Sequence, residues 1–193
     1  MEYGGRIENR GNTCYISVSL QVLLRYGPFV EKIRELSSIP ESNKIFGVLK
    51  NLADSLARDS VTVPDQLIRA LKIDPLVQTD VCEFLTKFFD VLIEAVPEEL
   101  PKVDGMNILQ QLFVSRISNK RTQNDTQTIY ILSVSKGVPI EQAVISSFEE
   151  IEQRFSFKPE VFFVQVSRMK PKENGFAKDT SPMPLSKSLN LTQ

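Results

Sequence analysis

The sequence predicts an α+β protein with a helical first half and a β-rich second half. Up to Val96, apolar residues recur every three or four positions, which is the helical period. Beyond the prolines at 97 and 101, the apolar runs 128–134 and 161–166 are rich in β-branched and aromatic residues, which is typical of strands. We expect one domain over residues 1–193, with 1–100 as its helical half and 101–193 as its β-rich half.

Five helices are expected in the first half. Asn12 and Thr13 are suitable caps for the first, and Gly27-Pro28 is a suitable stop for it. Pro64 lies near the first turn of the fourth, where proline is tolerated. A broad apolar face marks the fifth. The expected helices cover residues 14–26, 29–36, 45–56, 67–71 and 80–96.

The second half carries fewer and shorter signals. A strand is expected over 128–134 and a short helix over 139–148. Residues 161–166, Val-Phe-Phe-Val-Gln-Val, are the strongest strand signal, and their nearly continuous apolar character predicts burial on both faces. The polar stretches 118–127 and 170–180 are expected to be exposed loops.

Charge and composition exclude several classes of partner. The chain has 23 Lys and Arg against 24 Asp and Glu, without a long basic run, so neither nucleic acid nor a membrane surface is an expected partner. No apolar stretch is long enough to span a bilayer, and no signal peptide is apparent. We therefore expect a reducing, cytoplasmic or nuclear location, with Cys14 and Cys82 unpaired. Two cysteines without a histidine do not make a structural zinc site, so no metal or cofactor is expected.

Residues 9–15 read Asn-Arg-Gly-Asn-Thr-Cys-Tyr and stand at the start of the first expected helix. A helix start favours a thiolate at Cys14, because its unpaired N–H groups and its dipole point at the anion. The Asn9 side-chain amide and the Cys14 N–H are candidate donors to an oxyanion. The alternative is a buried cysteine beside a Gly-Asn turn, with a purely structural role.

A second segment, residues 78–85, reads Gln-Thr-Asp-Val-Cys-Glu-Phe-Leu at the head of the fifth expected helix. Asp80 suits a helix N-cap, and Glu83 suits the first turn, where a negative charge favours the dipole. Cys82 is expected to be a packed core thiol rather than a reactive one.

These segments closely resemble the cysteine box and the Gln-Gln-Asp-Ala-X-Glu-Phe-Leu motif of the ubiquitin-specific proteases, the papain-like deubiquitinases. Leu20-Gln21 continues the first match, and residues 159–169 and 183–191 resemble the family's palm segments in the correct order. The resemblance implies a papain-like fold with a helical thumb, an antiparallel β palm and short fingers. It implies ubiquitin or a ubiquitinated protein as partner, and thiol hydrolysis of ubiquitin C-terminal peptide and isopeptide bonds.

The resemblance also implies roles for five residues. Cys14 takes the nucleophile position and Asn9 the oxyanion position. Gln78, Asp80 and Glu83 fall where the family holds the ubiquitin tail, whose arginines and backbone suit acidic partners.

The chain departs from the family because it contains no histidine. We expect the domain to be incomplete, ending before the histidine-bearing palm strands, inactive alone, and in need of a partner that covers the missing palm face. The expected fingers, about residues 108–157, contain no cysteine and are expected to be metal-free. Two alternatives remain open, namely a non-catalytic relative that binds ubiquitin or scaffolds a complex, and an adaptor with no ubiquitin role.

Overall fold

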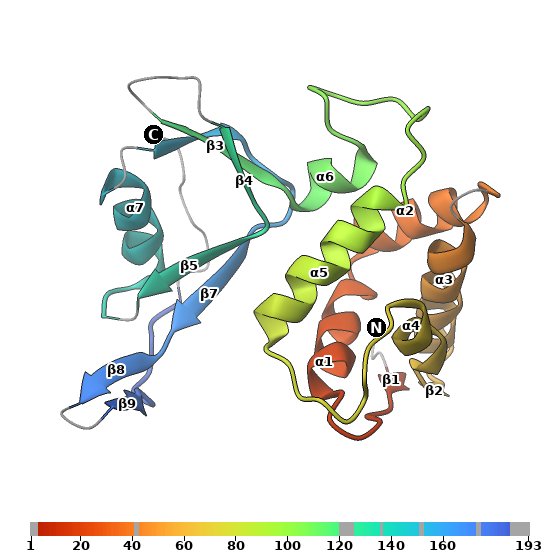
Figure 1. Cartoon of the computed structure of the whole chain (residues 1–193), viewed down its shortest axis with the longest axis horizontal. Helices are drawn as coiled ribbons and strands as arrows, with labels where there is room; N and C mark the ends of the chain where they lie inside the picture. Colours follow the sequence, from red (N-terminus) through yellow and green to blue (C-terminus); the bar gives the residue numbers. More distant parts are fainter. Residues whose placement is uncertain are drawn as a thin grey trace. The chain divides into compact units, whose positions relative to one another are not determined.

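The structure of the chain is a computed structural model that describes residues 4–40, 43–119, 126–135, 137–150, 153–172 and 175–185. Helices and small sheets combine into a mixed α+β fold, which confirms the expected class (Figure 1). The chain divides into two compact units, Met1–Leu112 and Phe113–Gln193.

The first unit contains the five expected helices. Two short strands, β1 and β2, pair in parallel beside them. The elements are β1 (Arg6–Ile7), α1 (Cys14–Leu23), α2 (Gly27–Ser37), α3 (Asn43–Ala57), β2 (Val61–Thr62), α4 (Asp65–Ala70) and α5 (Val81–Glu94), followed by α6 (Ile108–Phe113). The largest fully buried side chains of this unit come from α1 to α5: Ile16, Leu20, Phe29, Ile33, Leu36, Phe46, Leu49, Leu56, Leu67, Phe88 and Phe89.

The boundary between the first two helices differs from the expected one. α1 ends at Leu23, and the expected stop at Gly27-Pro28 is instead the first turn of α2. The reason is that proline suits the first helical turn, where its fixed φ is favourable and its missing N–H is not needed.

The helix α6 is not among the expected helices, because six residues are too few for a helical period to show. A capping box nevertheless marks its start. The Asn107 Oδ1 accepts hydrogen bonds from the N–H groups of Leu109 (3.1 Å) and Gln110 (3.0 Å). The Gln110 Oε1 accepts one in return from the Asn107 N–H at 2.8 Å. The Asn-X-X-Gln spacing is therefore a sequence signal that could have found this helix.

The described part of the second unit contains three small sheets and one helix. β4, β3 and β6 form an antiparallel sheet in that order, β5 pairs with β7, and β8 pairs with β9. The elements are β3 (Ser115–Asn119), β4 (Thr126–Ile129), β5 (Ile131–Ser135), α7 (Ile140–Glu150), β6 (Gln153–Phe157), β7 (Phe163–Ser167), β8 (Met169–Lys172) and β9 (Gly175–Lys178). The core of this unit is formed by Ile117, Val134, Ala143, Val144 and Phe148.

The single strand expected over 128–134 is two strands. β4 ends at Ile129 and β5 begins at Ile131, and the two pair with different neighbours. The apolar residues around Tyr130 are consecutive rather than alternating, so one straight strand cannot bury them on one face. The chain therefore changes sheet at Tyr130. The β5–β7 pair is parallel, which corrects the expectation of a wholly antiparallel sheet.

The expected strand over 161–166 is β7, which starts at Phe163. Its residues up to Val166 are half-buried, not buried on both faces as expected. Within the described residues β7 has one neighbouring strand, so this sheet covers less of it than a parallel sheet with helices on both faces would. Phe162, just before β7, packs edge-on against Phe155 with ring centroids 5.5 Å apart.

Both expected loops contain strands. β8 and β9 pair antiparallel within the expected loop 170–180, and Phe176 on β9 is 73% exposed. Gly175, the first residue of β9, has a backbone φ of +117°, which glycine tolerates. β3 and β4 extend into the expected loop 118–127 from its two ends, and residues 120–125 lie outside the described residues. Residues 186–191 of the palm-like segment lie outside them as well.

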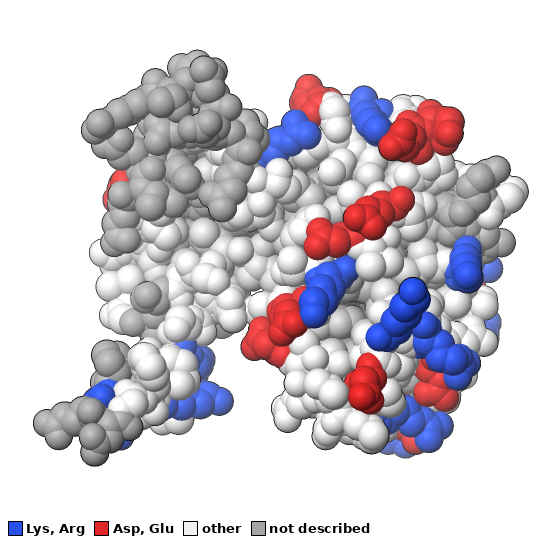
Figure 2. Space-filling view, in the orientation of Figure 1, with Lys and Arg blue, Asp and Glu red and all other residues white. Residues whose placement is uncertain are grey.

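None of the helices in the described part of the chain has the length and apolar character needed to cross a bilayer. Charged side chains of both signs are spread over the surface of the helical unit (Figure 2), in keeping with the net charge of −1.

Candidate active site

Cys14 is the first residue of α1, and its side chain is exposed. Thr13 occupies the N-cap position, but it makes no side-chain cap hydrogen bond, which corrects the expectation that its hydroxyl caps the helix. No capping side chain therefore competes for the first N–H groups of α1, at the end of the helix where its dipole favours a negative charge.

The hydroxyl of Thr13 is used instead to orient Asn9. Thr13 is completely buried; its Oγ1 donates to the Asn9 Oδ1 at 2.9 Å and accepts from the Arg10 N–H at 2.8 Å. Because the amide oxygen of Asn9 accepts this hydrogen bond, the NH₂ end of the same amide is the end that remains available. That end is a hydrogen-bond donor, which is what an oxyanion requires.

The cysteine box is tied to the segment that leads into α5. The Asn12 N–H donates to the Pro75 carbonyl at 2.9 Å, and the Asn12 Nδ2 donates to the Leu76 carbonyl at 2.7 Å. Gly11 has a φ of +68°, and a Cβ on it would lie 2.9 Å from the same Pro75 oxygen. Only glycine fits there without strain, so the Gly-Asn pair joins two segments that are far apart in sequence.

Tyr15 and Phe84 join the same two regions inside the core. Both side chains are buried, and their rings meet edge to face with centroids 5.4 Å apart, an arrangement that aromatic pairs favour. α1 packs against α5 through this contact. The structure thus brings the cysteine box and the 78–85 motif together.

The head of α5 presents the three expected tail-binding residues to solvent. Asp80 is the N-cap, as expected, and its Oδ1 accepts from the N–H groups of Cys82 (2.8 Å) and Glu83 (3.4 Å). The Glu83 carboxylate pairs with Lys87 at 2.7 Å. Gln78 precedes the helix and is exposed.

Cys82 is half-buried rather than a core residue, which corrects the expectation of a core thiol. Burial raises the pKa of its thiol, and the neighbouring Asp80 carboxylate raises it further by charge and hydrogen bonding. Both effects favour the protonated, unreactive form.

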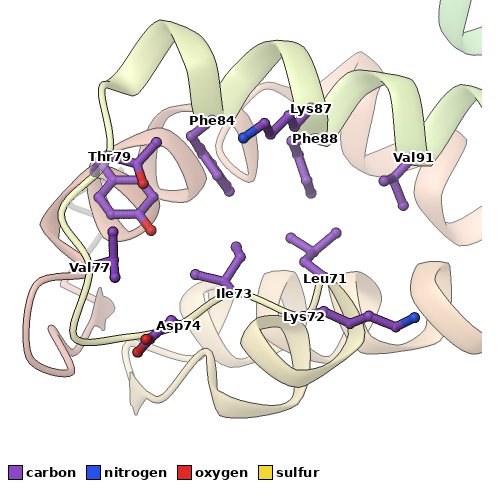
Figure 3. Close-up of a pocket in the computed structure, with 11 residues that line it drawn as sticks. Leu71, Lys72, Ile73, Asp74, Val77, Thr79, Phe84, Lys87, Phe88 and Val91 are labelled. Carbon is purple, nitrogen blue, oxygen red and sulfur yellow. The ribbon is translucent and has the colours of Figure 1, made fainter.

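A pocket of about 300 Å³ lies beside the cysteine box, between α5 and the segment before it. Phe84, Phe88 and Val91 reach into it from α5, and Leu71 and Ile73 face them from the opposite wall (Figure 3). Tyr15, the neighbour of Cys14 in sequence, also lines it. The wall opposite α5 is therefore the same segment that Asn12 holds in place.

One family model matches this chain over residues 6–193, and it describes the ubiquitin carboxyl-terminal hydrolases. The chain belongs to the ubiquitin carboxyl-terminal hydrolase family. The match is of the ubiquitin-specific protease type, covers nearly the whole chain, and confirms the family inferred from the cysteine box. Membership implies ubiquitin binding.

The residues expected at the site supply thiol, amide and carboxylate groups. Its 193 residues include no histidine. Among the described residues, no three His, Cys, Asp or Glu side chains gather into a group that would hold a metal ion.

Sequence reasoning missed two positioning roles in the site. It treated Thr13 and Asn12 as helix caps, whereas Thr13 orients Asn9 and Asn12 ties the box to residues 75–76. The Asn9-to-Thr13 spacing is a local signal for the first role. No local signal exists for the second, because the partners are more than sixty residues away.

Proposed function

We propose that this chain carries the nucleophile and the ubiquitin-tail site of a deubiquitinase, with Cys14 attacking the carbonyl carbon of the ubiquitin C-terminal glycine. One observation carries the proposal: an exposed cysteine opens α1, and the residue before it, Thr13, engages the amide oxygen of Asn9 and so leaves the amide NH₂ as the available donor.

In the proposed reaction, the Cys14 thiolate forms a bond to the carbonyl carbon, and negative charge moves to the carbonyl oxygen. The Asn9 Nδ2–H and the Cys14 N–H stabilise that oxyanion. Collapse breaks the carbon–nitrogen bond, and the amine leaves after taking up a proton. Water then hydrolyses the thioester, which releases ubiquitin with a free carboxylate and restores the thiol.

The ubiquitin tail is proposed to bind at the head of α5. Gln78, Asp80 and Glu83 are all exposed there and offer one amide and two carboxylates. Asp80 uses one carboxylate oxygen to cap α5, which fixes the direction of the group. A rigid carboxylate of this kind suits the arginines and backbone N–H groups of an extended tail.

The finer architecture follows from the same assignment. We propose that the helical unit is the thumb of a papain-like fold and that the β-rich unit supplies fingers and palm. The absence of histidine among the 193 residues means that they offer no imidazole as general base or as proton donor to the amine. We therefore propose that this chain, assayed alone, turns over slowly or not at all.

A surface beside Cys14 supports a partner that completes the site. Val18 and Val22 follow Cys14 at helical spacing on α1, and they are 59% and 64% exposed. Large apolar side chains exposed along one helical face favour contact with another protein surface. The proposed partner is a protein that covers this face, and we propose that it also supplies the general base.

The same missing imidazole favours a second candidate function, that of a non-catalytic ubiquitin-binding relative. Two assays on the folded chain separate the candidates: titration with ubiquitin, and release of fluorophore from a ubiquitin–fluorophore amide. We expect saturable binding that Asp80→Lys weakens and Cys14→Ser leaves intact, with little turnover. Turnover by the wild-type chain that disappears in Cys14→Ser would contradict the proposal that the chain is inactive when assayed alone, and it would contradict nothing else. No binding would contradict the tail site and favour an adaptor without a ubiquitin role.

A further inference from the structure

A larger groove lies between α3, α4 and α5, with a volume of about 650 Å³. Lys72 and Val91 line both this groove and the pocket beside Tyr15, but the other lining residues differ. Its volume falls within the range of sites that hold ligands or anchoring side chains. None of its lining residues belongs to the cysteine box or to the head of α5.

The rim of the groove is cationic. Lys44, Arg69 and Lys72 line it, and no Asp or Glu is among the lining residues that the structure describes. All three side chains are exposed, and within the described part of the chain none of them makes an ion pair. By contrast, Arg34 and Lys87 on neighbouring helices each pair with a carboxylate. Three cations placed around one hollow without a counter-charge form a site for an anionic group.

The floor of the groove is apolar. Its residues come from all three helices, and Val91 is 39% exposed although it faces a hollow rather than open solvent. The floor residues are Ile45, Val48, Ala70, Val91 and Ala95. An occupant that contacts both floor and rim must therefore combine apolar side chains with negative charge.

The α5 wall determines how such an occupant lies. Asp90 and Glu94 on α5 are next in sequence to the lining residues Val91 and Ala95, but neither of them lines the groove. Figure 2 shows side chains of both signs over this face of the helical unit. The cations that line the groove are Lys44 on α3, Arg69 on α4 and Lys72 just after α4, so the negative groups of the occupant are directed toward that side.

We propose that this groove docks an acidic amphipathic peptide segment of a partner protein. Its apolar side chains pack onto the floor between Val48 and Val91, and its carboxylates pair with Lys44, Arg69 and Lys72. A uniformly charged polyanion such as a nucleic acid fits less well, because it would also meet the carboxylates on the α5 side. The docking is independent of Cys14 and of ubiquitin.

The test uses a fluorescent peptide of glutamate and leucine, spaced so that the leucines share one helical face, and a matched peptide with lysine in place of every glutamate. Fluorescence anisotropy measures the binding of each peptide to the full chain. We expect saturable, salt-sensitive binding of the glutamate peptide and none of the lysine peptide. Charge reversal in Lys44→Glu with Arg69→Glu is expected to weaken binding roughly tenfold or more.

Matched variants separate the groove from overall charge and from loss of folding. Arg6→Glu with Lys102→Glu makes the same change in net charge on exposed residues outside the groove, and we expect it to retain most of the affinity. Val91→Ser tests the contribution of the apolar floor. Its control is Val103→Ser, which alters an exposed valine outside the groove. Circular dichroism confirms that each variant folds. If a reversal variant unfolds, Lys44→Gln with Arg69→Gln replaces it, and a smaller loss in the same direction is expected.

Three results would overturn the proposal. The first is no saturable binding of the glutamate peptide to the folded chain. The second is equal weakening by the groove and control reversals, which would indicate attraction to net charge alone. The third is concentration-dependent self-association that Lys44→Glu with Arg69→Glu abolishes, because the occupant would then be a second copy of the chain.

Discussion

The buried hydroxyl of Thr13 donates a hydrogen bond to the Asn9 Oδ1 over 2.9 Å, so the residue before the proposed nucleophile orients the proposed oxyanion donor. In Thr13→Ala this link is lost, and the Arg10 N–H loses its acceptor as well. We expect affinity for ubiquitin carrying a C-terminal aldehyde, whose adduct resembles the tetrahedral intermediate, to fall about tenfold or more. Affinity for unmodified ubiquitin should change little.

Thr13→Ser keeps the hydroxyl and serves as the control, with expected aldehyde affinity near that of the wild type. The losses of aldehyde affinity in Asn9→Ala and Thr13→Ala should not add when the two substitutions are combined, because both remove the same donor, the Asn9 amide. Additive losses, or a Thr13→Ala variant that binds the aldehyde normally, would show that Thr13 has no positioning role.

Gly11 is expected to tolerate no side chain. Its φ is +68°, and the Pro75 carbonyl oxygen would lie 2.9 Å from an added Cβ, so both the backbone and the neighbouring chain oppose alanine. We expect Gly11→Ala to lower the free energy of unfolding by about 1–3 kcal/mol, measured by urea denaturation. Gly27→Ala is the matched control, because a Cβ there meets nothing within 4 Å. Equal stability of the two variants would contradict this account of the turn.

Asp80 is expected to control both the stability of α5 and the reactivity of Cys82. Asp80→Ala removes the N-cap and should cost about 1 kcal/mol in the free energy of unfolding. Asp80→Asn keeps a capping oxygen but removes the charge that raises the Cys82 pKa. In Asp80→Asn the Cys82 thiol should therefore ionise at lower pH and react faster with iodoacetamide at neutral pH.

Mass spectrometry of each cysteine peptide measures those rates. Glu94→Gln, at the far end of α5, removes a charge from the same helix without touching Cys82 and should leave its alkylation rate unchanged. Slower or unchanged alkylation of Cys82 in Asp80→Asn would rule out the electrostatic explanation.

The ion pair between Arg34 and Asp54, 2.9 Å apart, is expected to make a small pH-dependent contribution to stability. The hydrogen bond from Arg34 lowers the pKa of Asp54 in the folded state. A lowered pKa stabilises the fold above the unfolded pKa, and the stabilisation is lost as pH falls through the folded value. Asp54→Asn should thus cost about 0.5 kcal/mol near neutral pH.

At acid pH, where Asp54 is protonated in both states, the same substitution should cost almost nothing. Urea denaturation of wild type and Asp54→Asn at both pH values measures the difference. A cost that does not change with pH would mean that the effect of Asp54 is not electrostatic.

The helical half was largely predictable because its signals are local. The apolar period of α5 and the Asp80 cap lie within one stretch of sequence, and both were predicted correctly. The sheets were less predictable, because the strand partners are distant and the consecutive apolar residues around Tyr130 also fit a single strand buried on both faces. Thr13 illustrates the limit within the site: a threonine hydroxyl can cap the helix that follows or bond backward, and burial in the fold decides between them.

The central claim, that Cys14 is a nucleophile at the end of a ubiquitin-tail site, is tested most directly by labelling the chain with ubiquitin that carries a C-terminal electrophile. Intact mass detects the adduct, and Cys14→Ser is the control. The account predicts one ubiquitin added per chain, at Cys14 and not at Cys82, with slower labelling in Asp80→Lys. A folded chain that forms no adduct, or one that is labelled equally well in Cys14→Ser, would contradict it.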